Sequence, residues 1–204
     1  MEIERALSQI SEIHEHLARG EVCRDWRAGP IALTGLLALG AAAVQSRLLG
    51  GPAAPAAFVA YWCVVAALAA LIGGGGIAGQ YRRETRPFAR RRTRTVLGQF
   101  LPCVAAGAIV TAGADWTSAA AVAALPGLWA VLFGLGMFAS RPYLPRLIGW
   151  VALFYLVAGG VMLMMAGSGA SLNPWAMGAT FGAGQLASGG ILYWNLERNH
   201  HGQT

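Results

Sequence analysis

The stretch VVAALAALIGGGGIAGQYRRETRPFARRRTRTVLGQFLPCVAAGAIV, residues 64–110, decides the fold. Between Tyr81 and Thr95 it holds seven arginines and one glutamate, and long apolar runs flank this basic centre on both sides. About 20 apolar residues cross the ~30 Å hydrocarbon core of a bilayer as a helix, and a helix satisfies its own backbone groups in lipid. The stretch therefore predicts a helical hairpin that crosses a membrane twice around an arginine-rich loop.

Six apolar stretches of this kind occur along the chain, at 31–49, 57–80, 96–114, 119–139, 147–166 and 175–196. Composition agrees, because 56% of the 204 residues are hydrophobic and 12% are charged, against about a quarter in soluble domains. We therefore predict an all-α, polytopic membrane bundle of six transmembrane helices over residues 28–198. An amphipathic helix at 1–27 and a tail at 199–204 would flank it in the cytoplasm.

Arginine marks alternate connections between the predicted spans. The connections at 81–95 and 140–146 carry seven and two arginines, whereas those at 51–55, 115–118 and 167–174 carry none. Basic connections stay in the cytoplasm under the positive-inside rule. The chain has no apolar core and cleavage site near its start that would indicate a signal peptide. We expect a multi-pass protein of the bacterial inner membrane with both termini in the cytoplasm.

An FGxGxxAS motif occurs at 133–140 and again at 181–188, 48 residues later. The preceding spans also resemble each other, with VAAG at 104–107 and LVAG at 156–159. Two parallel helical hairpins explain this match, with the first two spans as a diverged third hairpin. Chance in a chain with 28 glycines explains it as well. A true repeat would place a ligand site between the hairpins, as in transporters built from repeats.

Gln185 is the strongest polar candidate at membrane depth, because an amide in hydrocarbon has to find partners. It either lines a pocket for a neutral or apolar solute or forms an interhelical hydrogen bond. Small residues at four-residue spacing let helices approach closely, within the bundle or in a homo-oligomer. The run Gly73 to Gly76 weakens a helix and predicts a break or hinge. The candidate pocket or helix-packing residues are Phe133, Gly134, Gly136, Phe181, Gly182, Gly184, Gln185 and Ser188.

Several chemistries are disfavoured by the spans. No Asp, Glu, His or Arg lies in the middle of any span, whereas proton pumps and voltage sensors need such groups there. The chain has no lysine for a Schiff base, and its three cysteines are scattered singly. We expect no catalytic residue, no metal site and no cofactor.

The cytoplasmic side carries the second group of candidates. Apolar positions of the segment 1–27 follow a helical seam, and its acidic residues oppose the arginines in sign. This segment either docks on the arginine-rich loop or binds a partner. Beside a bilayer, the arginines attract anionic lipid headgroups rather than nucleic acid. The candidate lipid or partner surface comprises Ile3, Leu7, Ile10, Leu17, Arg82, Arg83, Arg86, Arg90, Arg91, Arg92 and Arg94.

Five sequence blocks resemble a family of small bacterial six-span membrane proteins: SEIHEHLARGEV at 11–22, QFLPC at 99–103, LPGLWAVLFGLGMFAS at 125–140, NPWAMGATFGAGQ at 173–185 and LYWNLER at 192–198. The resemblance covers nearly the whole chain and implies the same topology with an N-terminal amphipathic helix. The family has no assigned activity, so the resemblance implies no mechanism.

Two functions remain open from the sequence. The first is a non-enzymatic regulatory or accessory subunit that presents its N-terminal helix and arginine-rich loop to a cytosolic or membrane partner. The second is a small transporter or channel for a neutral or apolar solute, with its site between the FGxGxxAS hairpins.

Overall fold

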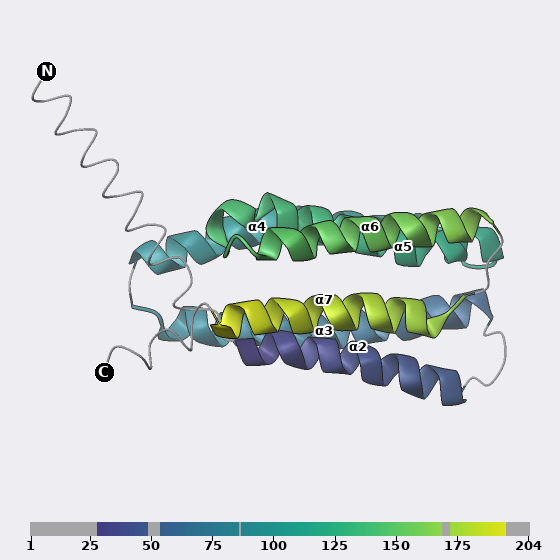
Figure 1. The fold of residues 1–204 in the computed structure, drawn as a ribbon, viewed down its shortest axis with the longest axis horizontal. Coiled ribbons are helices and arrows are strands. Elements are labelled where there is room, and N and C mark those ends of the chain that lie inside the picture. The colour runs from purple at the N-terminus through teal and green to yellow at the C-terminus, as the bar shows by residue number, and fades with distance from the viewer. Residues whose placement is uncertain (1–27, 49–53, 86, 169–171, 195–204) are drawn as a thin grey trace, which may run out of the picture.

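The computed structural model describes residues 28–48, 54–85, 87–168 and 172–194, and this part of the chain is helical apart from short connections (Figure 1). The predicted N-terminal helix and C-terminal tail lie outside the described residues. The elements are α2 (Ala28–Leu48), α3 (Pro55–Arg83), α4 (Pro87–Gly113), α5 (Ala119–Ala139), the 3-10 turn η1 (Arg141–Tyr143), α6 (Ile148–Gly167) and α7 (Pro174–Leu192).

The predicted all-helical bundle is confirmed, and each apolar stretch of the sequence coincides with one long helix. The helices α2 to α6 are long and apolar enough to cross a membrane. The 19 residues of α7 are not in that set. Five glycines, Thr180, Gln185 and Ser188 make this helix less apolar. The count of six spans therefore stays a prediction.

The arginine-rich segment differs from the loop that the sequence predicts. α3 continues to Arg83 and α4 begins at Pro87, so most of the segment 81–95 is helical. Two preferences explain the difference. Arginine is a good helix former, and proline suits the first turn of a helix because its missing N–H would be unpaired there anyway. The arginines are thus held on two helix ends.

The run Gly73 to Gly76 forms no break, since α3 is continuous across it. In lipid an unpaired backbone group costs several kcal/mol, which exceeds the helix penalty of about 1 kcal/mol for a glycine. Gly76 also has a packing role, because a Cβ there would lie 3.0 Å from the ring of Pro30 on α2. The predicted hinge is therefore wrong, and α3 is one long helix.

The helices form two layers of three, α2, α3 and α7 in one and α4, α5 and α6 in the other (Figure 1). The most extensive contacts join α2 to α7 and α5 to α6. Smaller contacts join α4 to α5 and α2 to α3, and the layers meet mainly through α6 and α7 and less extensively through α3 with α5 and α5 with α7. By contrast, α3 and α4 hardly touch each other. One edge of the two-layer bundle is closed, and the α3–α4 edge is open.

Glycines account for the two closest helix pairs. A Cβ on Gly127 of α5 would lie 2.7 Å from the carbonyl oxygen of Gly159 on α6, and the reverse distance is also 2.7 Å. Between α2 and α7, a Cβ on Gly35 would lie 3.0 Å from the carbonyl oxygen of Gly182. Such backbone contact is how helices associate in lipid, where no hydrophobic force draws them together.

Candidate functional site

The region between the two FGxGxxAS copies is filled by four aromatic rings. The ring centroid of Phe133 lies 5.1 Å from that of Phe100, 5.0 Å from Tyr155 and 5.7 Å from Phe181. Tyr155 is fully buried, and its hydroxyl donates a hydrogen bond of 3.4 Å to the carbonyl oxygen of Phe181. The two motif phenylalanines are therefore neighbours and form an aromatic core with Phe100 and Tyr155.

The first glycine of each motif copy faces a neighbouring helix backbone. A Cβ on Gly134 would lie 3.0 Å from the carbonyl oxygen of Ala152 on α6. A Cβ on Gly182 would lie 3.3 Å from the carbonyl oxygen of Gly35 on α2. Each copy thus packs its first glycine against the first helix of a different hairpin.

The second glycine of each copy faces the first helix of its own hairpin. A Cβ on Gly136 would lie 2.8 Å from the ring of Phe100 on α4. A Cβ on Gly184 would collide with the ring of Tyr155 on α6. The motif glycines therefore provide the space that these two rings occupy, which is the helix-packing interpretation of the motif.

Gln185 lies half-buried on α7, and its side chain makes no hydrogen bond to another described residue. The interhelical hydrogen bond that the sequence suggested is absent within this part of the chain. Ser188 is 4% exposed, and its hydroxyl likewise lacks a hydrogen-bond partner there.

Two polar positions matter more than the sequence analysis recognised. Gln45 on α2 is 2% exposed, and neither amide atom has a hydrogen-bond partner among the described residues. Thr111 on α4 accepts hydrogen bonds from two indole N–H groups, with its hydroxyl from Trp129 at 2.8 Å and with its carbonyl oxygen from Trp116 at 2.7 Å. In the sequence, Gln45 could have been noticed as a glutamine inside an apolar run, and Thr111 as a threonine near two tryptophans.

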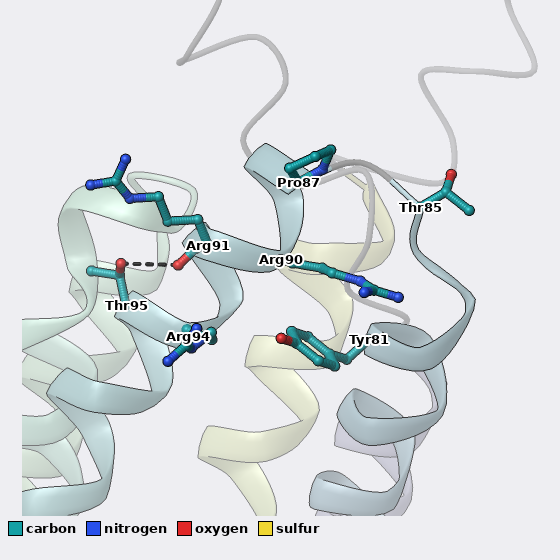
Figure 2. Close-up of a pocket in the computed structure, with 7 residues that line it drawn as sticks. All are labelled: Tyr81, Thr85, Pro87, Arg90, Arg91, Arg94 and Thr95. Carbon is teal, nitrogen blue, oxygen red and sulfur yellow. Dashed lines mark hydrogen bonds between the residues drawn. The ribbon is translucent and has the colours of Figure 1, made fainter.

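A pocket of about 720 Å³ lies between the end of α3 and the start of α4 (Figure 2). We call it the arginine pocket. Its lining comprises Tyr81, Thr85, Pro87, Arg90, Arg91, Arg94 and Thr95. Three of the predicted surface arginines are therefore gathered at one site, on the open edge of the bundle.

Arg90 holds the two helix ends together across this pocket. Its Nε donates a hydrogen bond of 2.7 Å to the carbonyl oxygen of Glu84, and its guanidinium lies 5.2 Å from the ring centroid of Tyr81. Figure 2 shows its side chain reaching from α4 toward Tyr81 on α3. The side chains of Arg91 and Arg94 are exposed. They are available to a ligand, while Arg90 has a positioning role.

The other predicted arginines lie elsewhere. Arg92 donates a hydrogen bond of 3.0 Å to the carbonyl oxygen of Tyr143 and lies over its ring, so it ties α4 to η1. Arg82 and Arg83 are exposed on α3 and do not line the pocket. Arg86, like the predicted seam residues Ile3, Leu7, Ile10 and Leu17, lies outside the described residues.

The arginine pocket is electropositive. Its described lining includes three guanidinium groups and no carboxylate, and arginine stays charged at any physiological pH. The start of α4 adds the positive end of a helix dipole beside Pro87. Across the described residues, no group of three or more His, Cys, Asp or Glu side chains is arranged to hold a metal ion. The arrangement is suited to attracting an anion.

The comparisons with known proteins add nothing to this description, because no protein-family model, curated protein or solved structure matches the chain.

Proposed function

We propose that the protein is a non-enzymatic, multi-pass protein of the bacterial inner membrane that serves as a regulatory or accessory subunit. All six long helices cross the membrane in this proposal, and the arginine-bearing ends of α3 and α4 lie in the cytoplasm with both termini. The cytoplasmic face then presents the acidic segment 1–27 and the arginine-rich helix ends to a partner. The pseudo-repeated contacts of the two FGxGxxAS copies fit a bundle of duplicated hairpins.

One observation carries the proposal: among the described residues, every arginine except Arg47 lies at one end of the bundle, on the ends of α3 and α4 or between α5 and α6. The arginine pocket lies there, whereas the interior around Phe133, Tyr155 and Phe181 is filled with aromatic rings. A rigid apolar interior suits a scaffold, and a charged cytoplasmic end suits recognition, because electrostatic complementarity selects partners. The alternative of solute transport between the FGxGxxAS hairpins would require these rings to move apart.

The test is a truncation of residues 1–27 in the native host. The full-length tagged protein, cross-linked in cells and purified, is expected to recover a discrete partner. The truncated protein should lose that partner while it still inserts and melts at the same temperature as the full-length bundle. Full recovery of the same partner by the truncated protein would contradict the proposal.

Solute flux distinguishes the alternative. Proteoliposomes of the purified protein should show no flux of small neutral solutes above empty liposomes. Flux that Gln185→Leu abolishes, while the fold is retained, would instead favour the transporter.

A further inference from the structure

The face of α4 that lines the arginine pocket continues into the apolar part of the helix. Arg91 and Arg94 are followed on that face, at steps of three and four residues, by Gly98, Leu101 and Ala105. All five of these residues are exposed, and 55% of the surface of Leu101 is accessible. A Cβ added at Gly98 would meet nothing within 4 Å. The pocket is therefore continuous with an exposed apolar stripe on α4.

The end of α3 shows the same change from charged to apolar. Tyr81 lines the pocket, and Ala78, Gly74 and Leu71 follow it on one face at steps of three and four residues toward the middle of the helix. Leu71 is 71% exposed, and a Cβ at Gly74 would meet nothing within 4 Å. Because α3 and α4 hardly touch, neither stripe is covered by the other helix.

A ligand that fills the arginine pocket and also covers the apolar stripes needs an anionic group and an apolar tail. The anionic group would lie among guanidiniums at the boundary between the arginines and the apolar runs, which is the depth of lipid headgroups. The volume of about 720 Å³ is that of a small-molecule site. A soluble anion would leave the apolar stripes uncovered. If a charged peptide such as the segment 1–27 lay along the apolar stripes, its acidic side chains would be buried in hydrocarbon, which is costly.

We propose that the arginine pocket and the two stripes bind an anionic phospholipid of the surrounding membrane. Its phosphate contacts Arg91 and Arg94, and its acyl chains lie along the apolar stripes of α3 and α4. Arg90 positions the site by joining α4 to Glu84 and Tyr81. This site shares the arginine-rich helix ends with the partner proposed above, but lipid binding needs neither the segment 1–27 nor a second protein.

The experiment measures binding of phosphatidylglycerol and phosphatidylcholine with identical acyl chains to the purified full-length protein in detergent, by native mass spectrometry. Phosphatidylglycerol should bind more tightly. The double variant Arg91→Gln, Arg94→Gln should weaken its binding roughly 30-fold, since each basic residue near an anionic headgroup contributes about 1 kcal/mol. Its control is Arg82→Gln, Arg83→Gln, which removes the same charge outside the pocket and should change binding less than threefold.

A second pair of variants tests the apolar stripe. Gly98→Leu fills the open space on the pocket face of α4 and should weaken phosphatidylglycerol binding without changing the charge. Gly113→Leu, at another open position of α4, should not. Both variants should melt like the parent protein, because a Cβ at either position meets nothing within 4 Å and both positions are exposed.

Three outcomes would overturn the lipid proposal. An equal loss of phosphatidylglycerol binding in the Arg82, Arg83 control would show that diffuse surface charge, and not the pocket, attracts the lipid. Equally tight binding of soluble glycerol 3-phosphate would show a headgroup site without the stripe. Several-fold tighter lipid binding after removal of residues 1–27 would show that this segment is the occupant. In each case the partner recovered by cross-linking remains a separate readout, so failure here is distinguishable from failure of the proposed function.

Discussion

The α5–α6 contact and the exposed face of α3 both contain glycines, but the two regions differ in packing. Between α5 and α6 the backbones meet at Gly127 and Gly159, and no side chain could be added there without moving a helix. On α3 the positions Gly73, Gly74 and Gly75 have open space around them. Glycine therefore marks close packing only where a neighbouring helix lies directly against it. The open edge is also where Arg90, Arg91 and Arg94 line the arginine pocket, which is the lipid site proposed above.

The largest effect is expected in the closed α5–α6 pair. Gly159→Ala places a Cβ 2.7 Å from the carbonyl oxygen of Gly127 and should destabilise the fold by about 1–3 kcal/mol, the usual cost of overpacking. The adjacent Gly160→Ala meets nothing within 4 Å and should be neutral or stabilising. Thermal melting in detergent compares the two. A similar loss in both variants would mean that α5 and α6 are not packed in this way.

The second comparison concerns the aromatic core. Gly184→Ala collides with the ring of Tyr155 and should destabilise the protein by about 1–3 kcal/mol. Tyr155→Leu vacates this space at its own cost of a few kcal/mol. A double-mutant cycle should show that the variant carrying both changes is more stable, by roughly 1 kcal/mol, than the sum of the two single losses predicts. Strict additivity would show that the two positions are not in contact.

A gain in stability is expected on the open edge. Gly74→Ala or Gly75→Ala adds a methyl group in open space and should raise stability by up to about 1 kcal/mol each through helix propensity. The same melting assay measures it, with Gly76→Ala as the matched control, because Gly76 packs on Pro30. Destabilisation by Gly74→Ala would show that something covers this face of α3.

The smallest effect concerns the α4–α5 connection, at the far end from the arginine pocket. The hydroxyl of Thr117 donates a hydrogen bond of 2.6 Å to the Asp115 carboxylate, and it lowers the pKa of that carboxyl below its usual value. A lowered folded-state pKa gives stability that is present above the unfolded pKa of about 4 and is lost as pH falls through the folded value.

Melting curves between pH 7 and about pH 3 should show a slight acid-dependent loss that Asp115→Asn removes. An unchanged acid-dependent loss in that variant would assign it to another group. Phosphatidylglycerol binding at the other end should be the same in both proteins.

Much of the fold follows from the sequence because apolar length alone fixes a membrane helix. Each of the six predicted stretches coincides with a helix, and α5 has the predicted bounds. The arginine-rich segment was mispredicted as a loop, since charge indicates which side of a membrane a segment faces and says little about its backbone. Arginine at 90, 91 and 94 is a helical spacing, and it could have indicated one shared helix face.

The candidate site was predicted in part. The sequence indicated Phe133 and Phe181. It did not indicate that Tyr155 and Phe100 fill the space between them, because this depends on helix pairing, which no periodicity encodes. Gln185 drew attention because it lies in a repeated motif, whereas the fully buried amide is Gln45. Pairing of α2 with α7 comes from tertiary packing across a long sequence separation, whereas α5 and α6 are consecutive helices joined by a short connection.

One face of α4 packs against α5, and its face toward α3 is open. Spin labels at Gly98→Cys and Gly107→Cys, each in a background without Cys23, Cys63 and Cys103, test this difference in membranes with one helix as its own control. A Cβ at Gly98 meets nothing within 4 Å, whereas a Cβ at Gly107 lies 3.8 Å from Leu132 on α5.

We predict a mobile, oxygen-accessible label at 98 and an immobilised, less accessible label at 107. A label at 98 as immobilised and as shielded as the label at 107 would contradict the account.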